Sequence, residues 1–321
     1  MKKLLTAMLA LLMLVGIIAI PAMAEDDDIY IAMFPKGYTG DFWKSVEAGA
    51  QQAAEDLGVT ITFEGPQSET DLEGQIRLIE NAIIKEPDVI AIAPLDSIGN
   101  VPVIESANEK GIKVITFNSK LECDIPLTHV ATDNWVAGEM AGQKLGELLG
   151  GQGKYAVIGA VESVKNNRDR SDGAVSYIEE NYPDMELITI QYTEGDLNRA
   201  LSAASDIITA NPDIAGFFTN NETTTIGLAT VLQEKGLAGE IVHVGFDATL
   251  QTVGYLEDGT TAAIVSQNPY NMGYMAVEKA LAAYNGEPLE PEYDTGVAMV
   301  TAENLYDADI QQIVDPEGSA N

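Results

Sequence analysis

Short apolar runs rich in β-branched residues alternate with longer helical patterns along the chain from residue 28 onward. Strands separated by helices are typical of a parallel sheet that carries helices on both faces. The first half contains strand-like runs at residues 29–34, 59–63, 89–93, 112–117 and 127–131. The second half repeats the plan at residues 155–159, 187–192, 214–219, 241–246 and 262–267. The pattern predicts an α/β protein with two doubly wound, Rossmann-like parallel-sheet domains.

Residues 41–57 show the helical spacing clearly. Apolar side chains recur there on one face of a 3.6-residue repeat, at Val46, Ala50, Ala53 and Leu57. We expect Asp41 to cap the start of this helix and Gly58 to end it, because aspartate and glycine favour those two positions.

Two further observations support a division into similar domains. The chain has 321 residues, which is about twice the ~150 residues of a usual single domain. Short sequence similarities also join the two halves: residues 87–90 resemble residues 212–215, and residues 111–115 resemble residues 239–243.

The chain is strongly acidic, with 17 basic and 50 acidic residues and a formal net charge of −33. Such a charge repels nucleic-acid phosphates and anionic lipid surfaces, so nucleic acid is excluded as a partner. The single cysteine, Cys123, excludes a disulfide within the chain and a cysteine metal cluster. The two histidines, His129 and His243, lie in apolar strand-like runs. We expect structural roles for all three residues.

The amino terminus has the order of a secretory signal peptide. Two lysines precede a mostly apolar run at residues 4–20, and a small-x-small triplet follows at residues 22–24. We expect residues 1–24 to be removed, although an uncleaved anchor stays open because ~20 apolar residues can span a bilayer. A lipid anchor would need a cysteine at the cleavage point, and Cys123 lies far downstream. We therefore expect a periplasmic protein without a lipid anchor.

The sequence contains no convincing motif for phosphate binding or hydrolysis. The Gly-Gly-Gln-Gly-Lys segment at residues 150–154 resembles a phosphate loop, but Tyr155 replaces the hydroxyl residue and the segment precedes a strand instead of following one. There is no Gly-x-Ser-x-Gly elbow and no metal-spaced pair of histidines. We therefore predict no catalytic residue, no metal and no cofactor.

Polar and aromatic side chains gather where the predicted strands end, which is where open α/β sheets bind ligands. Such Asp, Asn, Gln and Arg side chains can exchange paired hydrogen bonds with neighbouring hydroxyls, and aromatic faces can cover a sugar ring. The candidate ligand-binding residues are Lys36, Tyr38, Asp41, Phe42, Trp43, Asn118, Asn166, Arg170, Asn221, Asp247 and Gln267.

Several candidates have a structural alternative. Phe42 and Trp43 could belong to the core, and Asp41, Asn221 and Asp247 could cap helices. Agreement among six strand ends favours a binding site for a polyhydroxylated ligand over these separate explanations.

The order of these motifs resembles the periplasmic binding proteins of the ribose and galactose type, the substrate receptors of sugar ABC importers. The likeness covers nearly the whole chain after residue 24. It is carried by the aromatic pair Phe42-Trp43 and by the segments 116–118, 131–134, 170–173, 219–222, 244–247 and 263–267.

This resemblance implies a type I periplasmic binding fold, whose two lobes are joined by a three-stranded hinge and close around a ligand. The chain would cross between lobes near residues 132–133, 267–268 and 295–296. The implied lobes are residues 25–132 plus 268–295, and residues 133–267 plus 296–321. An ABC permease would recognise the closed form, a chemoreceptor is a further candidate partner, and we expect a monomer.

Position by position, the resemblance implies that Phe42 and Trp43 flank a sugar ring. It assigns hydrogen bonds with the hydroxyls to Arg170, Asn221, Asp247 and Gln267. Four positions depart from ribose receptors, which carry aspartate, arginine, asparagine and phenylalanine at or near Asn118, Ser119, Gly40 and Gly195. These departures leave the fold unchanged and weigh against ribose itself.

Three other functions are alternatives to monosaccharide binding. A receptor for a non-sugar polar solute, such as a cyclitol, a nucleoside or a furanone-type signal, would use the same fold for uptake or chemotaxis. A LacI-like regulator is disfavoured because no helix-turn-helix precedes the sheet and the charge is acidic. A sugar hydrolase would need paired carboxylates such as Asp41 and Asp247. We expect a monosaccharide-binding protein and not an enzyme.

Overall fold

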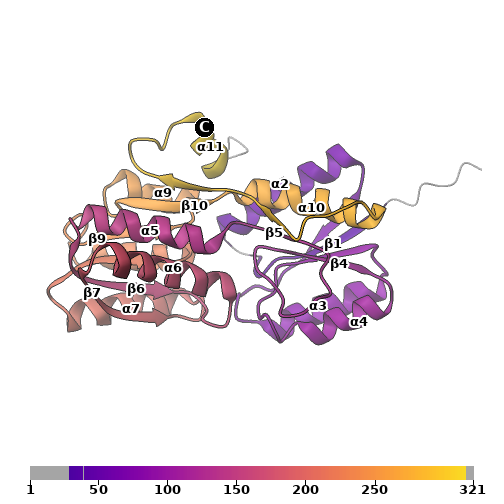
Figure 1. The fold of residues 1–321 in the computed structure, drawn as a ribbon, viewed down its shortest axis with the longest axis horizontal. Coiled ribbons are helices and arrows are strands. Elements are labelled where there is room, and N and C mark those ends of the chain that lie inside the picture. Colours follow the sequence, from indigo (N-terminus) through magenta and orange to yellow (C-terminus); the bar gives the residue numbers. More distant parts are fainter. Residues whose placement is uncertain (1–28, 39, 316–321) are drawn as a thin grey trace, which may run out of the picture.

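The computed structural model describes residues 29–38 and 40–315, so the predicted signal peptide lies outside the described residues. Figure 1 shows two lobes side by side along the longest axis of the molecule. Each lobe contains a six-stranded sheet with helices on both faces, which confirms the predicted α/β class. Within the described residues no helix is both long enough and apolar enough to cross a membrane.

In the first lobe the strand order is β11-β5-β4-β3-β1-β2, and all neighbours run parallel. Its strands are β1 (Tyr30–Phe34), β2 (Thr60–Phe63), β3 (Val89–Ile92), β4 (Lys113–Phe117), β5 (His129–Ala131) and β11 (Glu292–Asp294). Its helices are α2 (Asp41–Leu57), α3 (Leu72–Ile84), α4 (Val101–Glu109) and α10 (Pro269–Asn285). Alternate residues of β1 face opposite layers. Ile31 and Met33 join the core under α2 and α10, whereas Phe34 joins the core under α3 and α4.

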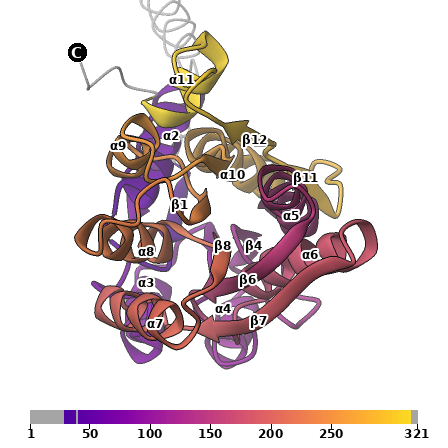
Figure 2. The ribbon, with the colours of Figure 1, turned by 90° about the vertical axis from the view of Figure 1, so that its left-hand side faces the viewer.

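The second lobe repeats this plan with the strand order β12-β10-β9-β8-β6-β7. Its strands are β6 (Gln152–Gly159), β7 (Asp184–Tyr192), β8 (Ile214–Thr219), β9 (Val242–Phe246), β10 (Ala263–Gln267) and β12 (Val297–Val300). Its helices are α5 (Asn134–Leu148), α6 (Lys165–Asn181), α7 (Leu197–Ala210), α8 (Glu222–Glu234), α9 (Leu250–Glu257) and α11 (Ala308–Val314). Figure 2 looks onto this lobe, with α5 and α6 on one face of the sheet and α7 and α8 on the other.

Strands β11 and β12 were not predicted, and they complete the two sheets from the carboxyl-terminal part of the chain. β11 lies parallel to β5 in the first lobe, and β12 lies antiparallel to β10 in the second lobe. The chain therefore passes between the sheets in three places: after β5, after β10 and between β11 and β12. Thr295 and Gly296 are the last two residues before β12, and both lie within hydrogen-bond distance of the Thr132 hydroxyl. Two of the crossing segments therefore lie side by side.

Helix α2 spans the predicted residues 41–57. Its end is confirmed, because Gly58 adopts the left-handed conformation with φ 68°. Its start was predicted wrongly in one detail: Gly40 occupies the cap position and Asp41 is the first helical residue.

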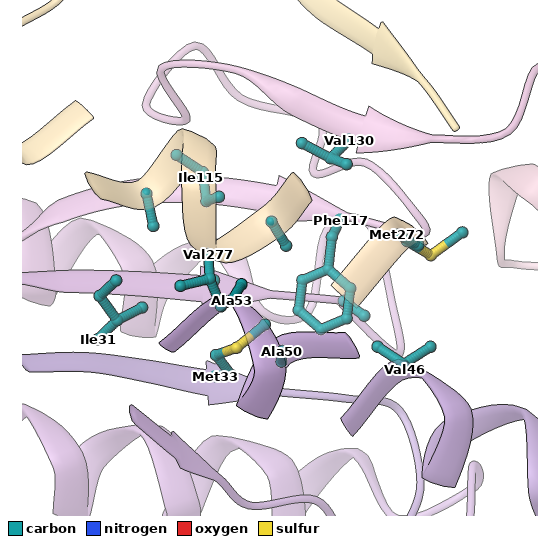
Figure 3. Packing of buried hydrophobic residues seen from close by; sticks show 14 of the residues in the cluster. Ile31, Met33, Val46, Ala50, Ala53, Ile115, Phe117, Val130, Met272 and Val277 are labelled. Atoms are coloured by element: carbon teal, nitrogen blue, oxygen red, sulfur yellow. The ribbon is translucent and has the colours of Figure 1, made fainter. Parts of the chain in front are cut away.

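Helices α2 and α10 approach each other so closely that glycine is required on both. A Cβ atom added to Gly49 would lie 1.9 Å from the carbonyl oxygen of Tyr270, and one added to Gly273 would lie 1.9 Å from that of Val46. Figure 3 shows the side chains around this contact, with Val46, Ala50, Met272 and Val277 packed over the sheet. The two helices are therefore fixed to one another as a unit.

Candidate functional site

A cavity of about 290 Å³ lies between the lobes, at the carboxyl ends of strands from both sheets. All but two of the predicted ligand-binding residues line it. These are Lys36, Phe42, Trp43, Asn118, Asn166, Arg170, Asn221, Asp247 and Gln267. Residues from strands that lie far apart in the sequence are therefore brought to one place by the fold.

Tyr38 and Asp41 are the two predicted residues outside the lining. The Tyr38 side chain is 59% exposed. The Asp41 carboxylate accepts a hydrogen bond from the Lys44 ammonium at 2.9 Å on the surface of α2. The arrangement of the cavity gives no support to a ligand contact by either side chain.

Three buried polar side chains join the lobes at the floor of the cavity. Lys36 Nζ donates to Asn166 Oδ1 at 3.2 Å, and Asn166 Nδ2 donates to Asn118 Oδ1 at 3.1 Å. Lys36 and Asn118 belong to the first lobe, whereas Asn166 lies in the first turn of α6 in the second. Direct hydrogen bonds between the lobes show that the cleft is closed. Asn118 and Asn166 also line a second cavity of about 380 Å³ on the side of the crossing segments.

Arg170 is held by its surroundings, and one of its nitrogens is left without a hydrogen-bond partner among the described residues. Its Nε donates to Asn134 Oδ1 at 2.8 Å, and its Nη1 donates to the carbonyl oxygen of Asn220 at 2.9 Å. The guanidinium carbon lies 4.0 Å from the centroid of the Phe246 ring. Nη2 is buried and has no hydrogen-bond partner among the described residues. Burial lowers the pKa of Arg170 to about 10, and the group therefore stays cationic at neutral pH.

The helix that carries Arg170 is packed tightly against its neighbour. A Cβ atom on Gly138 of α5 would lie 2.3 Å from the carbonyl oxygen of Arg170, so only glycine allows this approach. The close contact fixes the backbone of Arg170, and the two hydrogen bonds fix its guanidinium group. The side chain is therefore held in place by contacts within its own lobe.

Asp247 and Gln267 form a second ordered pair. Asp247 directly follows β9 in the left-handed conformation, with φ 66°. Its Oδ1 accepts from Gln267 Nε2 at 2.8 Å, and its Oδ2 accepts from the Glu222 backbone N–H at 3.0 Å. Gln267 Oε1 is left buried and without a partner in the described part of the chain. Burial raises the pKa of Asp247, and the nearby positive charge of Arg170 opposes that rise.

The aromatic candidates belong to the core as well as to the lining. Phe42 and Trp43 are 7% and 4% exposed, and their rings pack edge to face at 5.0 Å. The indole Nε1 of Trp43 donates to Glu69 Oε1 at 2.7 Å. Phe42 and Trp43 therefore belong to the hydrophobic core and also line the cavity.

Asn221 and Asp247 were both considered as helix caps, and only Asn221 is one. Asn221 caps α8, since its side chain accepts a hydrogen bond from the Thr224 backbone N–H at 2.9 Å, and it also lines the cavity. Asp247 does not cap α9, because Thr249 occupies that position.

Sequence reasoning missed part of the lining. The additional residues are Gly40, Gln67, Ser68, Glu69, Asn167, Gly195, Asp196, Leu197, Glu222, Thr223, Ile226 and Gln251. Most of them come from the loop before α3 and from the segments around the first turns of α7, α8 and α9, three or more residues beyond the ends of the preceding strands. Glu222 could have been found, because it directly follows the predicted residue Asn221.

Charged groups of both signs line the cavity, and they shift one another's pKa values. Burial lowers the pKa of Lys36 to about 7, and the Glu69 carboxylate partly counteracts this shift. Burial raises the pKa of Glu222 to about 7, and the charge of Asp247 adds to the rise. Two basic and four acidic side chains thus line this small space, together with neutral hydrogen-bond donors and acceptors. Such a lining suits a compact ligand that can both donate and accept hydrogen bonds.

A family model described as a periplasmic binding protein domain matches residues 31–288 of the chain. The ribose import binding protein RbsB of Escherichia coli (strain K12) is 26% identical over 302 residues, which cover 94% of this chain and 98% of that protein. The D-allose-binding periplasmic protein of the same strain is 27% identical over 250 residues, covering 75% and 80%.

Two solved structures are similar over almost their whole length. A carbohydrate transporter solute binding protein from Agrobacterium radiobacter, in complex with D-arabinose, is 30% identical with a TM-score of 0.86 and covers 90% of this chain and 100% of its own. An ABC transporter solute binding protein from Agrobacterium vitis, with bound D-fucose, is 32% identical with a TM-score of 0.85 and covers 89% and 99%.

Proposed function

Since the chain belongs to the periplasmic binding protein domain family, we propose that it is the periplasmic solute-binding protein of an ABC importer and binds a monosaccharide, a pentose or a hexose, between its lobes. The observation that supports this most directly is that two residues lining the cavity each have a buried polar atom without a partner among the described residues: the donor Arg170 Nη2 and the acceptor Gln267 Oε1. Leaving buried groups unpaired is unfavourable. A ligand with hydroxyl groups would satisfy both, because each hydroxyl can accept from one and donate to the other.

The remaining lining fits the same ligand class. Phe42 and Trp43 offer apolar surface for the C–H groups of a sugar ring. Asp247, Asn221 and Asn118 offer further oxygen acceptors and amide donors around it. Similar proteins contain D-arabinose and D-fucose, which are a pentose and a deoxyhexose.

Hinge closure is the proposed binding mechanism. The three crossing segments would bend, so that ligand bound to one lobe is enclosed when the other lobe closes. The lobe boundaries given above remain our prediction. We propose that the closed form is presented to a membrane permease, that the segment 1–24 directs export, and that the protein carries out no chemical step on its ligand.

A thermal-shift screen of the chain from residue 25 onward tests the proposal. Pentoses, hexoses, cyclitols and nucleosides are compared, because a ligand that binds only the native state raises the melting temperature. We expect a selective rise with one or a few monosaccharides, lost in Arg170→Ala and retained in Arg77→Ala, whose side chain is on the surface. A rise with a cyclitol or a nucleoside and with no monosaccharide would contradict the sugar assignment.

A further inference from the structure

Helix α2 begins at the cleft without a side-chain cap of its own. The cap position is Gly40, which has no side chain and adopts φ 101°. The first N–H groups of a helix have no partner within the helix, and a cap supplies one. Here the backbone N–H of Asp41 donates to Glu222 Oε1 at 3.4 Å. The acceptor comes from α8 of the other lobe.

The Glu222 carboxylate occupies space that the glycine leaves open. A Cβ atom added to Gly40 would lie 3.0 Å from Glu222 Oε2. The carboxylate therefore rests against the first turn of α2, within reach of its first backbone N–H group. Glycine at this position serves both the backbone conformation and the approach of the opposite lobe.

The backbone of Glu222 is connected directly to the cavity wall. Its N–H donates to Asp247 Oδ2 at 3.0 Å. The preceding residue, Asn221, forms a reciprocal capping box with Thr224, which orders the first turn of α8. The position of the Glu222 carboxylate is thus set by groups that also face the ligand cavity.

We propose that Glu222 is a closure latch: it caps α2 of the first lobe from the second lobe and thereby stabilises the closed form and slows ligand release. Opening of the cleft separates the carboxylate from α2 and leaves the helix uncapped. Glu222 is a positioning residue in this role. The effect on ligand release rests on the proposed function, whereas the effect on the closed form does not.

The test compares Glu222→Ala and Glu222→Gln with a matched control, Glu234→Ala, which removes an exposed carboxylate from the far end of the same helix. Dissociation of D-arabinose and D-fucose is followed by stopped-flow tryptophan fluorescence. Loss of a helix cap predicts dissociation faster by on the order of 5-fold in Glu222→Ala. Glu222→Gln keeps an acceptor oxygen and should lie between the wild type and Glu222→Ala. Glu234→Ala should match the wild type.

The ratio of the two sugar affinities separates a latch from a ligand contact. A latch acts on the closed form, so both dissociation rates should rise by the same factor and the ratio should stay constant. A changed ratio, or unchanged dissociation in Glu222→Ala, overturns the proposal.

Small-angle X-ray scattering of the protein without sugar tests the latch independently of the ligand. We expect a larger radius of gyration for Glu222→Ala than for the wild type and Glu234→Ala, because more molecules are open. If the wild type binds neither sugar, the kinetic arm fails together with the sugar assignment, and the scattering result alone decides the latch. Equal radii in that case overturn it.

Discussion

The two lobes share one plan but bring different chemistry to the cavity. In each lobe the fourth strand along the chain ends in a residue with left-handed backbone conformation, Asn118 at φ 60° and Asp247 at φ 66°. The first lobe places a neutral amide there, beside the aromatic pair on α2. The second lobe places a carboxylate there, close to Arg170 and bonded to Gln267. The two lobes thus share one backbone arrangement, but the aromatic pair comes from the first lobe and the group of Arg170, Asp247 and Gln267 comes from the second.

This difference has a physical consequence for how each half can be probed. The groups of the second lobe that we expect to meet ligand are held by hydrogen bonds, so their removal should affect binding first. The aromatic residues of the first lobe also hold the core together, so their removal should affect folding first. The following predictions are arranged from the largest expected effect to the smallest.

Trp43→Ala should destabilise the folded protein as well as weaken binding. The side chain is 4% exposed and packs on Phe42 and Phe117. Loss of a buried tryptophan typically lowers the free energy of unfolding by about 3 to 5 kcal/mol, which urea unfolding measures. Trp135→Ala is the matched control, because that indole is 42% exposed. Wild-type stability in Trp43→Ala would show that the first lobe does not depend on its aromatic residues.

Arg170→Ala and Asp247→Ala should each weaken sugar binding by about 1.5 to 3 kcal/mol, the usual contribution of a hydrogen bond to a charged group. Isothermal titration with the sugar found by thermal shift measures the change. Asp213→Ala is a suitable control, since that carboxylate pairs with Lys154 on the surface. Unchanged affinity in both variants would contradict the proposed role of these second-lobe side chains in sugar binding.

The pH dependence of stability should be alike in the two lobes. Burial lowers the pKa of His129 and of His243 from 6.5 to about 3. Both contribute stability that is fully present above pH 6.5 and is lost as the pH falls towards 3, because the unfolded chain then binds a proton that the native state excludes. Each histidine contributes a slope of about 1.4 kcal/mol per pH unit in that window.

His243→Gln and His129→Gln should each remove the slope of one proton. Denaturant unfolding between pH 7.5 and 4 measures it, and the value at pH 7.5 corrects for lost packing. His243 lies between the hydroxyls of Thr219 and Thr261, whereas His129 lies beside that of Thr116. A slope that is unchanged in either variant would mean that its histidine is not excluded from protonation in the native state.

Asn118→Asp should have the smallest effect. A carboxylate oxygen can still accept the hydrogen bond from Asn166 Nδ2, so we expect the fold to persist and the sugar affinity to change by about 0.5 to 1 kcal/mol. Isothermal titration compares this variant with Asp247→Ala. A change as large as that of Asp247→Ala would contradict the functional difference between the two strand ends.

Much of the fold could be predicted because the strands are buried and apolar. Ten strand-like runs correspond to β1 to β10, and residues 41–57 form α2 as expected. β11 and β12 were not predicted: β11 has the sequence Glu-Tyr-Asp and contains no apolar run, whereas β12 has the apolar sequence Val-Ala-Met-Val and could have been recognised. Their pairing depends on partners elsewhere in the chain.

Site residues that directly follow a strand could be predicted from the sequence, whereas site residues in longer loops could not. Asn118, Asp247 and Gln267 follow from their position in the sheet. Glu69 lies in a polar loop that looks like any exposed turn, and only the fold brings it to the indole of Trp43. Tyr38 and Asp41 were included because they follow the end of the first predicted strand, but neighbouring residues on a helix or turn point in different directions.

The paired glycines of α2 and α10 determine how movement at the hinge would reach the cavity. α10 starts two residues after β10, next to a crossing segment, and it is fixed to α2 through Gly49 and Gly273. α2 in turn carries Phe42 and Trp43 at its other end. A rotation of the backbone near residue 268 would therefore move α10 and α2 together, and the aromatic rings of Phe42 and Trp43 would move with them. A bulkier residue at Gly49 or Gly273 would push the two helices apart and displace the rings, even though neither glycine lines the cavity.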